Sequence, residues 1–232
     1  MKKTSNNFKS YKFIGYLWVI IAGAVLFLPN YLLIPYLNYN KICPLSPFCS
    51  SVSTPWGTFT SLFIFDGWAN LYAFIIWFAF LFLITIFMSA DMIKICTKSI
   101  ALALFPISII SNGMALLIDA IHGITLPAYG ASTFTYAFLG LLFGLSASII
   151  IHGLNKHSWK NQVFLTNTAF FFIITAGILF ANAVLFSIAP HVDYAAHEIA
   201  FLFGAIFMIV YAKLVVFSKR YSPLYKHRRP TF

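Results

Sequence analysis

A serine and a histidine at the start of two separate hydrophobic segments are the residues of this chain best suited to chemistry. Ser132 ends the triplet Gly130-Ala131-Ser132, and His197 lies in the stretch AAHEIAFLFG. A serine hydroxyl becomes a nucleophile when a neighbouring histidine takes its proton, and such a pair can catalyse acyl transfer. We therefore expect acyl-transfer chemistry if the fold brings the two side chains within hydrogen-bonding distance.

The depth of each serine along its helix favours Ser132 over a second candidate. The chain repeats the Gly-x-Ser triplet at Gly144-Leu145-Ser146, and common residues produce such triplets by chance. A helix rises about 1.5 Å per residue, which places Ser146 about 21 Å farther along the same helix. Because the topology deduced below puts His197 at the outer end of its segment, only Ser132 shares its level.

Small residues spaced four apart line the helix faces that would carry this pair. The two ridges consist of Ser132, Tyr136, Gly140 and Gly144 on one segment and of Ala196, Ala200 and Gly204 on the other. Small residues let two helix backbones approach closely, as a serine–histidine hydrogen bond requires. Tyr136 lies one turn below Ser132, where its ring can pack against the imidazole. The same ridges also suit ordinary helix packing with an interfacial histidine.

The composition indicates that these segments lie in a membrane. Hydrophobic residues make up 61% of the 232 and charged residues 9%, and the mean hydropathy is +0.88. A hydrocarbon layer of about 30 Å requires about 20 mostly apolar residues per helix, and no strand-like alternation suggests a barrel. We predict an all-α polytopic bundle, one domain over residues 1–232 with short cytoplasmic tails. Its six transmembrane helices are residues 13–33, 68–89, 100–118, 131–151, 163–187 and 195–217.

The basic residues set the predicted orientation. The chain carries 15 Lys and Arg and a formal net charge of +10. All of them except Lys41 lie at the N-terminus, in alternate loops or at the C-terminal end. By the positive-inside rule both termini are cytoplasmic in the cell membrane, and Ser132 and His197 face outward. The basic tail fits an anionic lipid surface, so we expect the lipid bilayer and no nucleic acid as a partner.

The remaining polar residues suggest structural roles. Cys43 and Cys49 share one outer loop, where they form a disulfide or remain free thiols, and Cys96 looks inert. No cluster has the spacing of metal ligands, so we expect no metal and no cofactor. Asp193 and Glu198 either tune the imidazole of His197 or, in the interpretation we favour, are charges at a wet helix start. The residues expected to hold helices together are Ser146, Ser148, Asn167 and Asn182.

The motifs around Ser132 and His197 resemble those of a known protein family. GASTFTYAFLG, with a tyrosine four positions after the serine, and the later AAHEIAFLFG resemble the fourth and sixth helices of the rhomboid intramembrane serine proteases. TPWGTFTSLFIFDGWANL is similar to the family's segment leading into the second helix. The resemblance covers nearly the whole chain. It implies a six-helix core, a Ser132–His197 dyad that faces outward, and transmembrane protein substrates whose helices unwind near the outer surface.

The resemblance also assigns supporting roles. The oxyanion of the tetrahedral intermediate would be bound by the Ser132 backbone N–H and by the side-chain amide of Asn70, with Gly130 and Tyr136 in support. The chain departs from the family around the proposed site: Thr133 follows the serine in place of the usual glycine, and Asn70 and Phe74 stand where the second helix usually has His and Asn. Phe65-Asp66 also replaces an upstream His-Gly.

Two other functions remain open at this stage. A catalytically silent rhomboid-like protein that binds transmembrane helices would account for Thr133 and Phe74, although silent relatives tend to lose the serine or the histidine. A transporter or channel would favour charges in mid-membrane or broken helices in repeats, and neither is evident. The substrate, the disulfide state, the oligomeric state and the pathway do not follow from the sequence.

Overall fold

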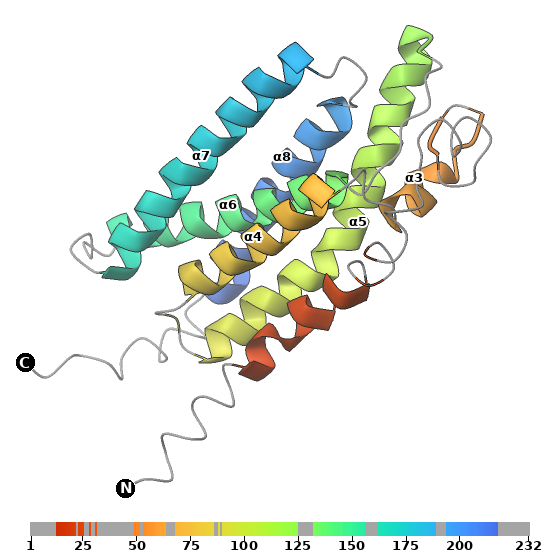
Figure 1. The fold of residues 1–232 in the computed structure, drawn as a ribbon. Coiled ribbons are helices and arrows are strands. Elements are labelled where there is room, and N and C mark those ends of the chain that lie inside the picture. The colour runs from red at the N-terminus through yellow and green to blue at the C-terminus, as the bar shows by residue number, and fades with distance from the viewer. Residues whose placement is uncertain are drawn as a thin grey trace, which may run out of the picture.

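The computed structural model describes residues 13–21, 23–25, 28, 31, 49–51, 53–63, 68–85, 88, 90–124, 132–155, 162–188 and 194–217. For residues 68–71, 74, 162–163 and 178–188 it describes the backbone alone. Within these ranges every regular element is helical, and the only bridge pairs Ser51 with Thr54 (Figure 1). The predicted all-α fold class is therefore confirmed.

Long helices make up most of the described chain. They are α4 (Trp68–Thr85), α5 (Ala90–His122), α6 (Ser132–Asn155), α7 (Gln162–Ile188) and α8 (Tyr194–Tyr211). A π-helical turn, Ala212–Val216, continues α8. Before α4 come the short helix α3 (Gly57–Thr60) and the 3-10 turn Ser61–Phe63, preceded by an apolar helix, Phe13–Val25.

Among the described residues, three helices are long and apolar enough to cross a membrane. They are Ala90–His122, Ser132–Asn155 and Tyr194–Val216. Shorter apolar helical stretches occur at Phe13–Val25, Ile75–Thr85 and Phe164–Gly177. Large apolar side chains such as Leu117, Leu202 and Leu214 are exposed on the spanning helices, as expected for surfaces that face lipid rather than water.

Helix α5 is longer than the sequence suggested. The predicted span of residues 100–118 lies inside a helix of 33 residues, which is about 50 Å long at about 1.5 Å per residue. Lys94 and Lys98 were counted among the basic residues of the loops, but they lie on the first turns of α5, together with Asp91. A helix of this length extends beyond the hydrocarbon layer, so its charged end reaches the interface without ending the helix. Pro106 lies within α5 and does not terminate it.

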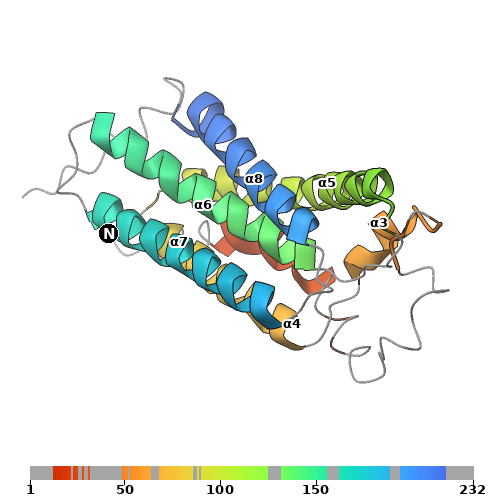
Figure 2. The ribbon, with the colours of Figure 1, turned by 90° about the horizontal axis from the view of Figure 1, so that it is seen from above.

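Helix α6 occupies the centre of the bundle. Figure 2 shows α8 running alongside it, and α4, α5 and α7 also contact it. Most of its side chains are buried, among them Phe134, Phe138 and Leu141, which are fully enclosed. A helix that is apolar on all sides is expected inside a bundle. This central position surrounds α6 with other helices.

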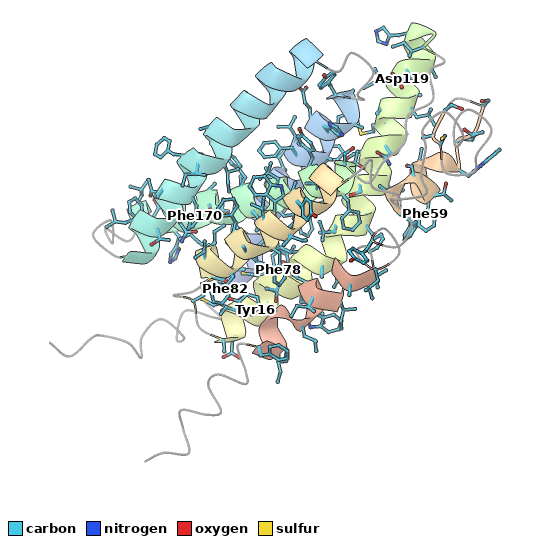
Figure 3. The ribbon with its side chains drawn as sticks, in the orientation of Figure 1. Tyr16, Phe59, Phe78, Phe82, Asp119 and Phe170 are labelled. Carbon is cyan, nitrogen blue, oxygen red and sulfur yellow. The ribbon has the colours of Figure 1, made fainter. Side chains whose placement is uncertain are left out.

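An outer segment is anchored close to the beginning of α6. Asn112 of α5 donates its side-chain N–H to a backbone carbonyl of α3, at 3.1 Å. A series of ring contacts leads inward from Phe59, which Figure 3 shows on α3, to Phe63 at 5.3 Å and then Phe105 at 6.1 Å. Phe105 meets Phe134 edge to face at 4.9 Å. Such pairs add packing energy beyond the area they bury, so the outer segment supports the first turn of α6.

Candidate active site

Ser132 and His197 meet where two helices begin. Ser132 is the first residue of α6 and His197 lies in the first turn of α8. The Ser132 Oγ is 2.5 Å from the His197 Nε2, a hydrogen bond slightly shorter than the usual range between oxygen and nitrogen. His197 is 6% exposed, and Ser132 is half-buried. The prediction that these two residues share a level is confirmed.

The ring of Tyr136 holds the imidazole from one side. The ring centroids of Tyr136 and His197 are 4.3 Å apart and their planes differ by only 4°. Tyr136 lies one turn after Ser132 on the same face of α6, because residues four apart in a helix are neighbours. The stacked ring restricts rotation of the imidazole and keeps Nε2 directed at Ser132. The contact predicted between these two rings is present.

Glycines at the α6–α8 contact make this proximity possible. A Cβ added at Gly204 would lie 2.6 Å from the Ala137 carbonyl oxygen, and one added at Gly144 would lie 2.5 Å from that of Ala205. A Cβ at Gly140 would overlap the carbonyl of Phe201. Non-bonded carbon atoms do not approach backbone atoms so closely, so larger residues would separate the helices. The predicted packing ridges are confirmed, and Ala200 is fully buried.

The second nitrogen of His197 has no hydrogen-bond partner among the described residues. Its Nδ1 is buried and unpaired, as are the hydroxyls of Thr133 and Thr135. Glu198 is exposed, in agreement with its reading as a solvated charge. Leaving a buried polar group unpaired costs about 1–3 kcal/mol. These three atoms all lie within about one turn of the Ser132–His197 pair. The free-energy cost of burying unpaired polar groups is therefore concentrated at this site.

The other serine candidate is bound elsewhere. Ser146 donates a hydrogen bond to Asn167 of α7 at 3.3 Å, and both residues are fully buried. Ser148 donates to the Gly144 carbonyl at 2.7 Å. The first contact joins α6 to α7, as predicted for Ser146 and Asn167. The second lies within α6 and satisfies a polar group in mid-helix, so the predicted role of Ser148 between helices stays a prediction. Asn182 lies in the part of α7 where only the backbone is described.

Several predicted supporting residues fall outside what the structure describes in full. Asn70 lies in the first turn of α4 and Phe74 one turn later, and only their backbones are described. Gly130 and Asp193 lie outside the described residues. The oxyanion roles assigned to Asn70 and Gly130 therefore stay predictions.

The cysteines differ in state, and the described residues offer no site for a metal. Cys49 is disulfide-bonded and fully buried, whereas Cys96 is a buried free thiol. Cys43 lies outside the described residues. The disulfide at Cys49 favours the bonded alternative over the free thiols. No three His, Cys, Asp or Glu side chains within the described ranges are grouped so that they could hold an ion.

The buried hydroxyl of Thr133 was not assigned a role from the sequence. It appeared only as a departure from a family pattern, yet the side chain is 3% exposed and lies directly after Ser132. A spacing of four, three and four residues connects Thr133 to Ala137, Gly140 and Gly144. That spacing is typical of one helix face, and it is the signal that would have placed Thr133 against α8.

Comparisons with protein-family models, with curated proteins and with solved structures found no match to this chain. The geometry of Ser132, His197 and Tyr136 therefore carries the functional interpretation.

Proposed function

We propose that this chain is an intramembrane serine protease of the rhomboid type, with Ser132 as nucleophile and His197 as general base. The observation that carries the proposal is the 2.5 Å contact between Ser132 Oγ and His197 Nε2. The stack of Tyr136 on the imidazole supports it, because an oriented base is what an activated serine requires. The resemblance of the two helix motifs to the rhomboid proteases adds independent support.

The proposed reaction follows from the roles of the two side chains. Ser132 Oγ attacks the carbonyl carbon of a peptide bond while His197 Nε2 takes the hydroxyl proton. Collapse of the tetrahedral intermediate breaks the C–N bond, and the imidazolium gives its proton to the leaving amine. A water molecule, activated by the same nitrogen, then hydrolyses the acyl-enzyme. Ser132 is half-buried rather than enclosed, which is compatible with access for water and substrate.

The negative charge of the intermediate needs hydrogen-bond donors. The backbone N–H of Ser132 is one, since N–H groups in the first turn of a helix have no partner within that helix. The amide of Asn70, in the first turn of α4, is the second donor in this proposal. Loss of one such donor costs about 3 kcal/mol of transition-state stabilisation in a soluble serine protease. Phe74 cannot replace a donor, so we expect a slower enzyme rather than an inactive one.

The proposed arrangement in the membrane has six crossings, cytoplasmic termini and a site near the outer surface. The three long apolar helices support it, as do the shorter ones that overlap the other predicted segments. The substrate class is a transmembrane protein whose helix unwinds near that surface, because the peptide bonds of an intact helix are shielded by its own hydrogen bonds.

Purified protein in detergent tests the proposal. Wild type should cleave a fluorescent transmembrane substrate, whereas Ser132→Ala and His197→Ala should not. Ser146→Ala is the matched control, because it removes a buried serine hydroxyl from the same helix far from His197 and should retain activity. Cleavage that persists in Ser132→Ala would rule out this nucleophile.

The second candidate is a catalytically silent protein that binds transmembrane helices. Thr133 and Phe74 favour it, since both depart from the pattern of active relatives. A fluorophosphonate probe separates the two, because it labels only an activated serine. Labelling of wild type but not of Ser132→Ala supports the protease, and folded wild type that stays unlabelled and inert supports the silent reading.

A further inference from the structure

Two of the unpaired polar atoms near the dyad face the same contact between helices. Thr133 Oγ1 and His197 Nδ1 both lack a hydrogen-bond partner among the described residues. Thr133 is 3% exposed and His197 6%, so bulk water does not satisfy them. Polar atoms buried to this degree are normally paired with protein or with an ordered water.

The packing of α6 on α8 places Thr133 and His197 on the two helix faces that meet. The two helices run parallel, and their facing positions repeat at intervals of four, three and four residues. These positions are Thr133, Ala137, Gly140 and Gly144 on α6 and His197, Phe201, Gly204 and Met208 on α8. A Cβ added at Gly140 would meet Phe201, and one added at Gly144 would meet Met208. A Cβ added at Gly204 would meet Ala137. Thr133 and His197 are the outermost members of the two facing rows.

The protonation of the imidazole requires an acceptor at this position. His197 Nε2 accepts the hydroxyl proton of Ser132 only if Nε2 is unprotonated, so the neutral ring must carry its hydrogen on Nδ1. In soluble triads a carboxylate accepts that hydrogen and fixes the tautomer. Glu198 is exposed and does not bond to this nitrogen. A hydroxyl oxygen is the polar acceptor that the facing row offers.

We propose that Thr133 and His197 bind one water molecule between them, and that this water holds His197 in its reactive tautomer. The Nδ1–H donates to the water oxygen, and the water donates to Thr133 Oγ1. A single bridging water joins polar atoms about 4.5 to 5.5 Å apart, because its two hydrogen bonds of about 2.8 Å meet at an angle. Thr133 is then a positioning residue that acts through His197. Its catalytic consequence and the assignment of the tautomer rest on the proposed protease function, whereas the water site, inferred from two buried unpaired atoms, does not.

Thr135 provides an internal control for this site. It is also buried and also carries an unpaired hydroxyl. Successive helical residues are rotated by about 100°, so Thr135 lies about 200° around α6 from Thr133 and away from α8. Removal of its hydroxyl changes the same chemical group at the same depth but leaves the facing rows intact.

Nitrogen-15 NMR of histidine-labelled protein in detergent tests the tautomer directly. The chain has six histidines, and the spectrum of His197→Gln identifies the signals of His197. Wild type should show protonated Nδ1, unprotonated Nε2 and an Nδ1 proton protected from exchange with solvent. Thr133→Val should mix the tautomers and lose the protection, Thr133→Ser should restore both, and Thr135→Val should resemble wild type. Thr133→Ala replaces the valine variant if the latter is unfolded.

An unchanged His197 spectrum in Thr133→Val, or an equal change in Thr135→Val, would overturn the proposal. Kinetics provides the second readout: Thr133→Val should lower kcat about ten-fold with KM within about two-fold, the loss expected for one hydrogen bond of about 1.4 kcal/mol. Wild type without protease activity but with the predicted tautomer response would reject the protease function and retain the water site. An active wild type whose His197 spectrum and kcat do not change in Thr133→Val would retain the protease function and reject the water site.

Discussion

Gly204 of α8 lies directly against the backbone of α6 at Ala137. A Cβ at Gly204 would stand 2.6 Å from the Ala137 carbonyl oxygen and 2.9 Å from the Leu141 nitrogen. The same two helices carry Ser132 and His197 at their N-terminal ends. The distance between the helix axes at this glycine therefore governs the distance between the two reactive side chains.

Gly204→Val should separate α6 from α8 and lower both stability and activity. We expect a loss of about 1–3 kcal/mol in the free energy of unfolding, as for other overpacked contacts, and a fall in kcat/KM of at least about 10²-fold, since small displacements of catalytic groups are costly. Thermal unfolding and cleavage rates measure the two effects. Gly113→Ala, where a Cβ meets nothing within 4 Å, should preserve both. Full activity of Gly204→Val would contradict a rigid α6–α8 contact.

Tyr136 should act through its ring rather than its hydroxyl. Tyr136→Phe keeps the surface that stacks on His197 at 4.3 Å, so its kcat/KM should stay within about two-fold of wild type. Tyr136→Leu removes the aromatic stack, and kcat should fall about two- to twelve-fold, which corresponds to about 0.5–1.5 kcal/mol for an aromatic pair. A Phe variant as impaired as the Leu variant would instead indicate a role for the hydroxyl.

Ser146→Ala should affect stability and leave chemistry unchanged. The variant loses the hydrogen bond that Ser146 donates to the buried side chain of Asn167. We expect a loss of about 1–3 kcal/mol in the free energy of unfolding and an unchanged kcat at temperatures where the protein is folded. Unfolding curves and progress curves on the same preparations make the comparison. A large fall in kcat of folded Ser146→Ala would show that α7 is coupled to the dyad.

The disulfide at Cys49 should stabilise the outer segment next to α3. Cys49 is fully buried, and a Cβ at Gly57 of α3 would collide with the Cys49 carbonyl, so the cysteine segment packs tightly on that helix. Cys49→Ser should lower the free energy of unfolding by about 2–4 kcal/mol. Unfolding with and without dithiothreitol measures this, and Cys96→Ser, at a free thiol, should not add to the effect of the reductant. Equal unfolding of oxidised and reduced protein would argue against this anchoring role.

The sequence predicted the helical class and the pairing of Ser132 with His197, because both follow from features with a regular period. Apolar runs gave the segments, and residues four apart gave the ridges that let α6 and α8 approach. The rise per residue was enough to reject Ser146.

By contrast, the predicted start of α5 was wrong, because hydropathy detects the apolar part of a helix and not the charged turns that continue it. The partner of Ser146 could not be named, since the face of α7 that meets α6 depends on packing. Thr133 was underestimated because burial of a hydroxyl between two helices becomes visible only when both are placed.

The parallel course of α6 and α8 has an electrostatic consequence. Ser132 and His197 lie in the first turns of their helices, so two helix N-termini converge on the same point. Each carries the equivalent of about half a positive elementary charge from its aligned peptide dipoles. The two helix dipoles therefore contribute a positive potential at the dyad. Such a potential favours an anion over a neutral group, and it opposes a lasting positive charge on His197. A group that becomes negative only while it reacts is thus held more strongly at that moment than before or after.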